Sequence, residues 1–279
     1  MAWHRTQSQG TRRRRSLASM GGWATVFFLV VTVVYLLFTV GPLAGLFTYA
    51  PCSALLCPST LEIARRALGL SLRCSLIATG IAFMIGLPAA IYLARGPSRG
   101  RVLLDSLVEL PISLPPLVLG VALLLVWGRR GLFGQHLAEP ISFTATAVVI
   151  AQIVVAAPFF VRIAKTSIEH VPHSLEEASR TLGAGTFQTY LRVTLPLARA
   201  GILSGIVTCW ARAMSEFGAT IMFAGSFPGR TQTLPTAIYM TMQHDVSASV
   251  GLSVIMLLFS AASFVVAQTC IARAAPLRR

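Results

Sequence analysis

The sequence predicts an all-α membrane protein built as a bundle of six transmembrane helices, and three observations support this. The chain of 279 residues is 55% hydrophobic and only 11% charged, whereas soluble domains carry about 25% charged residues. Its mean hydropathy is +0.73. Six apolar segments of roughly 20 residues are each long enough to cross a bilayer as a helix.

The six predicted spans follow one another with short polar connections. They are Trp23–Leu46, Ser71–Leu93, Leu110–Trp127, Phe143–Ile163, Ala198–Ala224 and Ala248–Ile271. The second contains Gly80, Gly86 and Pro88. Proline and glycine are tolerated in membrane helices where neighbouring helices or water satisfy the freed carbonyl groups, so kinked spans indicate a packed bundle around a polar path. Before the second span, Leu55–Leu70 is predicted to pass from a loop into a short amphipathic helix.

The first span follows the basic run RRRRSL, a combination that also occurs in export signals. The apolar core of a signal is about 7–15 residues long. Trp23–Leu46 is longer, and five more spans follow it. We therefore predict an uncleaved first helix, preceded by a basic, cytoplasmic N-terminus at residues 1–22.

The basic residues predict the orientation of the spans. The net charge of +14 comes from 23 basic residues, all arginine except Lys165, against 9 acidic ones. With the N-terminus inside, sixteen basic residues fall on the cytoplasmic side and six on the other, while Arg212 lies within the fifth span. Because cytoplasmic loops carry the excess of Lys and Arg, both termini are predicted to be cytoplasmic.

A nucleic-acid partner is not expected, although a pI of about 11.1 would suggest one for a soluble protein. The arginines are spread between the spans and no RNA-binding motif accompanies them. The expected environment is the lipid bilayer of the cell (inner) membrane.

One cytoplasmic loop, VPHSLEEASRTLGAGTFQTYLRVTLP at Val171–Pro196, has the features of a short helix. Ser174 and Glu177 have the S-x-x-E spacing of a capping box, and Gly183 can take the left-handed conformation that often follows a helix. The apolar residues of this helix share one face: Leu175, Ala178 and Leu182. A helix of about eight residues is marginal alone in water, so the apolar face needs a partner, either its own bundle or another protein.

The same stretch resembles the cytoplasmic EAA loop of ABC-importer permeases, in which Glu-Ala-Ala is followed at fixed distances by Gly, an aliphatic residue and Leu-Pro. The matching positions are Glu177, Ala178, Gly183, Val193, Leu195 and Pro196. Ser179 replaces the third alanine with another small residue. The resemblance implies that the short helix is a coupling helix, which docks in a groove of a separate cytoplasmic ABC ATPase subunit.

Four further stretches resemble the molybdate/tungstate branch of type I ABC permeases. They are LPISLPPLVLG (Leu110–Gly120), GRRGLFG (Gly128–Gly134), EFGATIMFAG (Glu216–Gly225) and PGRTQTLPTAIY (Pro228–Tyr239). The similarity covers roughly residues 67–271, a type I permease domain. It leaves residues 23–46 as an extra first helix relative to five-span members, and residues 272–279 as a short cytoplasmic tail.

This resemblance implies the membrane-spanning permease subunit of an importer for molybdate. Such a subunit would pair with a second copy of itself and receive its cargo from an extracytoplasmic molybdate-binding protein. A sulfate/thiosulfate or tungstate permease is the alternative within the class, because these anions share shape and charge. An ATP-independent secondary transporter is the alternative from another class, but it would usually show internal repeats with broken helices in matching places.

Charged residues inside and outside the predicted spans are candidates for the transport path. Arg212 and Glu216 are four apart in the fifth span and share a helix face, and a charge there costs at least about 2.5–3.5 kcal/mol. They either line the oxyanion path or its gate, or form a structural pair. Arg129, Arg130 and Arg230 at the predicted external mouth either attract a dianion or the binding protein, or anchor the interface.

The remaining chemistry of the sequence does not indicate an enzyme. The chain lacks the G-x-x-x-x-G-K-[ST] phosphate loop, so ATP is expected to bind to a partner subunit, and no cofactor is expected here. The five histidines form no metal-ligand pattern, and no catalytic or metal-binding residue is predicted. Cys52 and Cys57, in the predicted external loop, would form a disulfide if that loop faces an oxidising compartment.

Overall fold

The computed structural model describes residues 22–49, 57–96 and 100–274. All regular elements in these ranges are helices, which confirms the predicted all-α class. The chain divides into two units, Met1–Ala50 and Pro51–Arg279. The described part of the first unit contains α1 (Gly22–Tyr49), whose 28 residues extend about 42 Å at 1.5 Å per residue. It is long and apolar enough to cross a membrane.

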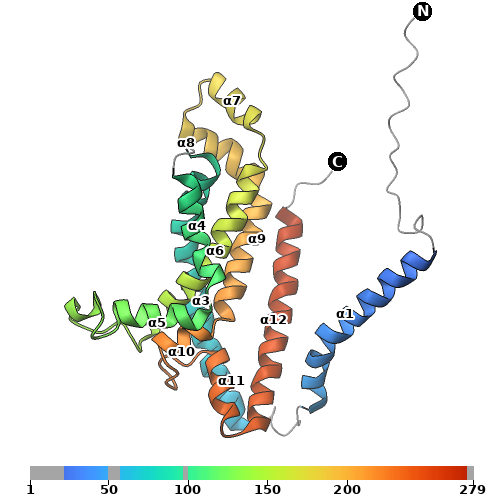
Figure 1. Ribbon diagram of the computed structural model, residues 1–279, viewed down its shortest axis with the longest axis vertical. Coiled ribbons are helices and arrows are strands. Elements are labelled where there is room, and N and C mark those ends of the chain that lie inside the picture. The colour runs from blue at the N-terminus through green and yellow to red at the C-terminus, as the bar shows by residue number, and fades with distance from the viewer. Residues whose placement is uncertain (1–21, 50–56, 97–99, 275–279) are drawn as a thin grey trace, which may run out of the picture. The chain divides into compact units, whose positions relative to one another are not determined.

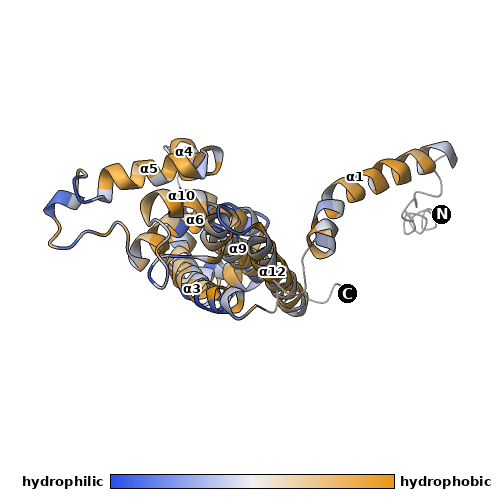
Figure 2. Cartoon of the chain, turned by 90° about the horizontal axis from the view of Figure 1, so that it is seen from below, coloured by the Kyte–Doolittle hydropathy of each residue, from blue (hydrophilic) through white to orange (hydrophobic). Residues whose placement is uncertain are grey.

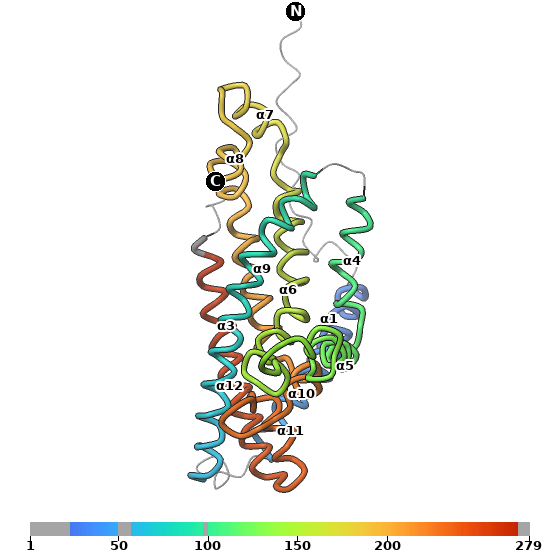
Figure 3. Tube along the Cα trace, turned by 90° about the vertical axis from the view of Figure 1, so that its left-hand side faces the viewer, coloured from blue at the N-terminus to red at the C-terminus, as the bar shows by residue number. Residues whose placement is uncertain are grey.

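The described part of the second unit is a helical bundle. Its elements are α3 (Pro58–Arg95), α4 (Arg101–Ser113), α5 (Pro116–Trp127), η2 (Gly134–His136), α6 (Ala145–Glu169), α7 (His173–Thr181), α8 (Thr186–Thr189), the π-helical η3 (Tyr190–Thr194), α9 (Leu195–Met214), α10 (Gly218–Phe223), α11 (Leu234–Met242) and α12 (Val246–Ala274). Helices α3, α6 and α9 pack on one another and α12 packs on α9. Helices α7 and α8 lie at one end of the bundle and α11 lies at the other (Figure 1; Figure 3).

Small residues let α3, α6 and α9 approach closely, as is usual between membrane helices. A Cβ atom at Gly86 of α3 would lie 2.8 Å from Cδ1 of Phe160, and one at Gly205 of α9 would lie 3.2 Å from Cδ2 of the same ring. The aromatic ring of α6 therefore fills the space left by two glycines on its two neighbours. Fully buried alanines continue the contact, among them Ala82, Ala90, Ala156 and Ala164.

The predicted third span, Leu110–Trp127, is wrong as a single helix. The chain is helical from Arg101, breaks after Ser113 and resumes at Pro116, and the two helices are bent by 109°. Prolines explain the break, because they lack an amide hydrogen and disfavour helix in the residue before them. Helix α5 then packs on α10, where a Cβ atom at Gly120 would lie 2.8 Å from Cα of Ala219.

The predicted fifth span, Ala198–Ala224, is also interrupted. Helix α9 ends at Met214, and the short α10 begins at Gly218. The carboxylate of Glu216 accepts a hydrogen bond from the backbone nitrogen of Ala219 at 2.8 Å. This bond satisfies an amide in the first turn of α10, which would otherwise lack a partner inside the helix. The acidic side chain thus stabilises the start of a new helix.

The helix predicted within Leu55–Leu70 forms, but as the first part of a longer helix and not as a short one. Helix α3 begins at Pro58 and continues without interruption for 38 residues to Arg95. Proline at the start of a helix costs no hydrogen bond, and the next proline, Pro88, lies far along the helix. The first, fourth and sixth predicted spans correspond to α1, α6 and α12, with ends that differ by a few residues.

Five of the described helices are long and apolar enough to cross a membrane, and the bent pair α4–α5 makes six if it counts as one span. Figure 2 shows hydrophobic residues along α4 and α5. None of the residues of α4 is fully buried, and its exposed hydrophobic side chains are Val102, Leu103, Leu104, Leu107 and Leu110. Lipid or another protein must cover this surface in the membrane.

Candidate functional site

The predicted cytoplasmic loop forms α7, but the capping box at its start is wrong. Helix α7 begins at His173 with Pro172 as its N-cap, and no side chain caps it. Ser174 and Glu177 therefore lie inside the helix, two residues too late for the reciprocal bonds of a capping box. Gly183 does have a left-handed backbone, with φ of 87°, and its amide donates to the carbonyl of Arg180.

A buried ion pair anchors the first turn of α7. The side chains of Arg95 and Glu176 are 5% and 4% exposed, and Arg95 Nε donates to Glu176 Oε1 at 3.1 Å. The same carboxylate oxygen accepts from the Thr194 hydroxyl at 2.9 Å. Arg95 lies at the end of α3 and Thr194 at the end of η3. One carboxylate of α7 therefore holds two distant parts of the bundle.

The guanidinium group of Arg95 uses its remaining nitrogens in the same place. Nη2 donates to the carbonyl oxygens of Ile168 at 2.9 Å and Val171 at 2.6 Å. Nη1 lies 2.9 Å from Nε2 of His173. Because guanidinium groups only donate, Nε2 of His173 accepts, and the proton of a neutral ring is on Nδ1. The buried charge is thus surrounded by acceptors, as a desolvated arginine requires.

Several apolar side chains of the loop are exposed, in contrast to this buried pair. Leu182 is 89% exposed, Phe187 75%, Leu191 51% and Leu175 45%. Ala178 and Glu177 are exposed as well. The apolar face predicted for this helix therefore has no partner among the described residues. We refer to Leu175, Leu182, Phe187 and Leu191 as the exposed loop face.

The other predicted loop residues hold the loop together. Ser179 Oγ lies 3.3 Å from Oγ1 of Thr189, which joins α7 to α8. Leu195 is half-buried and packs against the core cluster that includes Phe160. Pro196 lies in the first turn of α9 and is exposed.

Arg212 and Glu216 come together as predicted from their spacing, at the end of α9. Arg212 Nη1 lies 2.8 Å from Glu216 Oε2, and the side chains are 27% and 1% exposed. This contact is an ion pair without an aligned hydrogen bond. The other oxygen of Glu216 is the one that binds the amide of Ala219. The acid is therefore committed to structure, while part of the arginine remains accessible.

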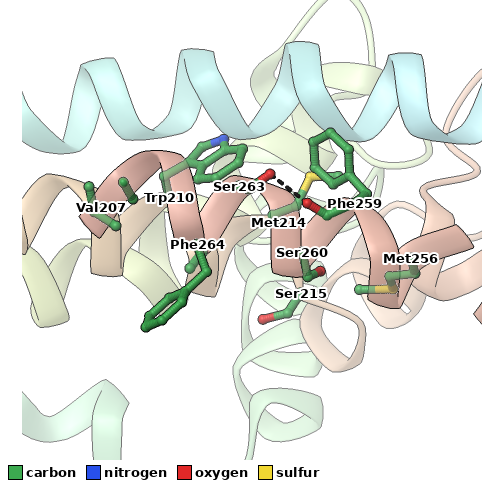
Figure 4. A pocket seen from close by; sticks show the side chains of 11 residues that line it. Val207, Trp210, Met214, Ser215, Met256, Phe259, Ser260, Ser263 and Phe264 are labelled. Carbon is green, nitrogen blue, oxygen red and sulfur yellow. Dashed lines mark hydrogen bonds between the residues drawn. The ribbon is translucent and has the colours of Figure 1, made fainter. Parts of the chain in front are cut away.

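An apolar cavity of about 330 Å³ lies beside this pair, between α9 and α12. Figure 4 shows Met214, Ser215, Trp210 and Phe259 among its lining residues. The rings of Trp210 and Phe259 meet edge to face with centroids 6.3 Å apart. Trp210 also donates to the Ser75 hydroxyl at 3.1 Å. The end of α9 is thus fixed to α3 but separated by open space from parts of α12.

The three arginines predicted for the external mouth do not share one cavity. Arg129 and Arg130 line a cavity of about 220 Å³ together with Ser142. Arg230 is exposed in a different loop, next to Gly229 with its φ of 73°. The structure therefore separates the predicted external mouth into two places.

A second basic cavity was not predicted. It has about 520 Å³ and is lined by residues of α3 and of the loop before α11. Its charged lining residues are Glu62, Arg65, Arg66 and Arg73. Glu62 binds both Arg65 and Arg66, whereas Arg73 has no ion-pair partner among the described residues. The spacing of positions 62, 66 and 73 on one helix face was the available sequence signal.

Three ion pairs connect α4 with α6, and these also were not predicted. They are Arg101–Glu169 at 3.9 Å, Asp105–Lys165 at 2.5 Å and Glu109–Arg162 at 3.8 Å. The partners follow one another in opposite directions along two antiparallel helices. The sequence contained a signal for these pairs, because charged residues recur every four positions in α4 and residues of opposite charge recur every three or four positions in α6. We call this set the α4–α6 ladder.

Cys57 immediately precedes α3, and its Sγ lies 3.1 Å from Oγ of Ser59. Hydrogen bonds from Ser59 lower the pKa of the Cys57 thiol below its ordinary value. Cys52 lies outside the described residues, so the Cys52–Cys57 disulfide stays a prediction. Among the residues that the structure describes, no group of three or more His, Cys, Asp and Glu side chains is placed to hold a metal ion.

Comparisons with known proteins agree with this architecture. The family described as binding-protein-dependent transport system inner membrane component matches residues 84–275. The Escherichia coli K12 molybdenum transport system permease protein ModB is 40% identical over 182 residues, 64% of this chain and 80% of that protein. The probable transport system permease protein NifC of Clostridium pasteurianum is 36% identical over 234 residues, 82% of either chain.

Solved structures show the same fold. A bacterial ABC transporter involved in the import of the acidic polysaccharide alginate aligns with a TM-score of 0.71 and covers 92% of this chain and 96% of that chain. The sequence identity in this alignment is 16%, so the likeness concerns the fold alone.

Proposed function

Because this chain belongs to the family of binding-protein-dependent transport system inner membrane components, multi-pass transport permeases and not enzymes, we propose that it is the permease subunit of an ATP-driven ABC importer for molybdate. The assignment of molybdate as the cargo rests on the 40% sequence identity with the Escherichia coli molybdenum transport permease over 182 residues. ATP is bound and hydrolysed by a separate cytoplasmic ABC ATPase subunit. An extracytoplasmic molybdate-binding protein delivers the anion.

The exposed loop face supports the ATPase partner. It carries four large apolar side chains in water, and exposed apolar surface of this kind marks interaction sites. Glu177, Ala178 and Gly183 stand at the positions of the EAA pattern within this loop. The proposed role of the loop, from Glu177 through Ser179 and Gly183 to Leu195 and Pro196, is to dock on the ATPase.

A pair of chains completes the proposed transporter. Each chain has one α7, and an importer with two ATPase subunits needs one coupling helix for each. ATP-driven closure of the ATPases brings the two α7 helices together, and the bundle changes from inward-facing to outward-facing by hinge or shear movement. The orientation proposed from the positive-inside rule places both termini on the ATPase side.

Arginines supply the proposed attraction for a dianion along the path. Arg212 is partly accessible beside Glu216 and is assigned to the path or its gate. Arg129, Arg130 and Arg230 are exposed and are assigned to the external mouth, where positive charge raises the local concentration of anions. High affinity resides in the binding protein.

Uptake of molybdate tests the cargo. The chain is reconstituted in proteoliposomes with its ATPase subunit and binding protein, and radiolabelled molybdate is offered with ATP inside. We expect ATP-dependent uptake that an excess of tungstate reduces and an equal excess of sulfate does not. Uptake of sulfate or thiosulfate at a higher rate than molybdate would contradict the assignment of the cargo.

The docking role is tested with charge reversal on α7. Glu177→Arg places a cation in the exposed surface, and we expect the ATPase subunit to be lost from the purified complex. Glu139→Arg is the matched control, because Glu139 is exposed in the loop before α6. Retention of the ATPase by the Glu177 variant would refute docking through this face.

A further inference from the structure

The backbone connection that follows α7 is poorly suited to transmit a displacement to α8 and α9. On one side the chain continues through Gly183, Ala184 and Gly185, and added Cβ atoms at both glycines would meet nothing within 4 Å. On the other side a link of three residues, 170–172, joins α7 to α6 alone, and Val171 within it is buried in the core. Glycines in open surroundings flex easily. A coupling helix held by its backbone alone would therefore be connected firmly only to α6, and not to α3 or α9.

Side-chain contacts of Arg95 and Glu176 supply the missing rigid connection. Arg95 ends α3 and binds the carbonyl of Ile168 near the end of α6. Glu176 binds Arg95 and, through the same oxygen, Thr194. Thr194 immediately precedes α9 and is fully buried. Three membrane helices therefore meet α7 at one carboxylate and one guanidinium group.

The place where α9 begins is itself unusual. The five residues before it, Tyr190–Thr194, form a π-helical turn, and such turns are rare and frequently occur at functional sites. This turn brings the Thr194 hydroxyl within 2.9 Å of the Glu176 carboxylate. The start of α9 is thus connected directly to the first turn of α7.

Burial of the pair argues against a purely stabilising role. Two charges removed from water rarely stabilise a fold more than apolar residues of similar volume, whereas they fix geometry through directed bonds. Here each of the three guanidinium nitrogens of Arg95 has a hydrogen-bond acceptor within reach. Such a fully satisfied group is rigid, which is the property that a mechanical joint needs.

We propose that Arg95 and Glu176 are positioning residues that form the joint between the coupling helix and α3, α6 and α9. The proposal rests on the proposed function as an ABC permease. When the ATPase moves α7, the carboxylate carries the ends of these helices with it. Without the joint, the exposed loop face still docks and ATP is still hydrolysed, but the membrane helices no longer follow.

Two neighbouring glutamates provide a matched test. Glu176→Gln removes the charge of the joint, and Glu177→Gln makes the same change on the exposed side of the same helix. The measured quantity is ATP hydrolysed per molybdate imported in proteoliposomes. We expect this ratio to rise at least about fivefold in the Glu176 variant with the ATPase still bound. In the Glu177 variant hydrolysis and uptake fall together, so the ratio stays unchanged.

The proposal is overturned if the Glu176 variant keeps the wild-type ratio, or if both variants raise it equally. If the Glu176→Gln variant fails to assemble, Thr194→Val tests the proposal instead. This variant removes the hydrogen bond from the Thr194 hydroxyl to Glu176 but keeps both charges of the pair and the shape of the side chain. We expect at least a twofold rise of the ratio for Thr194→Val. A wild-type ratio there, together with failed assembly of Glu176→Gln, would mean that the pair is only structural.

A readout without cargo separates this inference from the choice of molybdate. Ser215→Cys, in a chain whose external Cys52 and Cys57 are replaced by serine, reports the end of α9 through labelling by a membrane-impermeant maleimide. We expect ATP with vanadate to change the labelling, and Glu176→Gln to abolish that change while the ATPase stays bound. If the labelling of the wild-type background changes with ATP and vanadate but no molybdate is taken up, the assignment of molybdate as the cargo is wrong, while the proposed joint is still supported. Switching that persists in Glu176→Gln overturns the joint.

Discussion

At the scale of single residues, Glu216 and Arg212 have unequal roles within one ion pair. Glu216 is 1% exposed and one of its oxygens binds the amide of Ala219, so its charge is needed for the turn into α10. Arg212 is 27% exposed and makes its contact with Glu216 through one end of a planar group with five donors. In the role proposed for Arg212, its remaining donors would bind the anion.

We predict that Arg212→Gln reduces molybdate uptake about tenfold while the complex still assembles. Glutamine keeps a donor near Glu216 but removes the positive charge that a dianion would meet. The measurement is initial uptake rate, with thermal stability and ATPase co-purification as controls and Arg212→Lys as the variant that keeps the charge. Normal uptake would contradict a role in the path, and loss of assembly alone would identify a structural pair.

Cys57 leads to a prediction with a defined pH dependence. Because hydrogen bonds from Ser59 lower the pKa of its thiol, the reactive thiolate forms at lower pH than in an ordinary cysteine. The protein is reduced, Cys57 is alkylated with iodoacetamide over a range of pH, and the extent of alkylation is measured by mass spectrometry. We expect the pH of half-maximal alkylation rate to be lower in the wild type than in Ser59→Ala. Labelling only after reduction would also reveal the predicted bond to Cys52. Equal midpoints in the two chains would contradict the hydrogen-bond effect.

At the scale of elements, α4 differs from every long helix of the bundle in how it is held. It buries no residue completely, and its half-buried Val108 reaches the core cluster around Phe160. The α4–α6 ladder provides the rest of the attachment. Ion pairs tolerate sliding better than interdigitated side chains, so α4 is the element best suited to move against the bundle.

The ladder predicts measurable coupling between its partners. In the central pair the side chains of Lys165 and Asp105 are 16% and 30% exposed, so their attraction is less screened than at the surface. A double-mutant cycle with Lys165→Ala and Asp105→Ala should give a coupling energy of about 1 kcal/mol. The cycle is measured by reversible unfolding in mixed micelles.

The outer pair is the matched control for this cycle. Glu109 and Arg162 have side chains 41% and 61% exposed, with nearest atoms 3.8 Å apart. We expect a smaller coupling energy for Glu109→Ala with Arg162→Ala. A central coupling no larger than the outer one would show that the ladder does not hold α4.

Element boundaries and site residues differ in how far the sequence determines them. Hydropathy predicted the existence of every long helix, because a span needs only length and composition. It missed the break between Ser113 and Pro116 and the end of α9, because Glu216 stabilises a new helix only through a three-dimensional contact. The doublet Glu176–Glu177 was equally ambiguous. Only the fold decides which of the two meets Arg95.

At the scale of the whole molecule, the positions of the charged residues in α3 indicate which part of this helix lies within the bilayer. Between Arg73 and Arg95 the helix carries no charged residue, and these 22 positions extend about 33 Å at 1.5 Å per residue, close to the roughly 30 Å of a hydrocarbon core. With Arg95 at the cytoplasmic boundary, Arg73 lies at the outer one. In the orientation proposed above, the first part of α3, with Arg65 and Arg66, projects into the extracytoplasmic space, where the proposed binding protein would approach.

The first unit of the chain leads to the last prediction. The family match begins at residue 84, which leaves α1 (Gly22–Tyr49) outside the matched region. We therefore predict that deletion of residues 1–50 leaves assembly with the ATPase intact and molybdate uptake within about twofold of the full chain. In the proposed orientation the remaining helices keep Arg95 and Arg101 as cytoplasmic flanks for insertion of α3.

A replacement variant separates packing from membrane insertion in this experiment. In it, an unrelated apolar helix of the same length takes the place of α1, and the basic run before it is retained. If replacement restores an activity that deletion removes, α1 contributes only to insertion and the permease core is complete without it. If both variants lose uptake although the ATPase still co-purifies, specific contacts of α1 are needed for transport, and the first helix is not an addition to the permease domain.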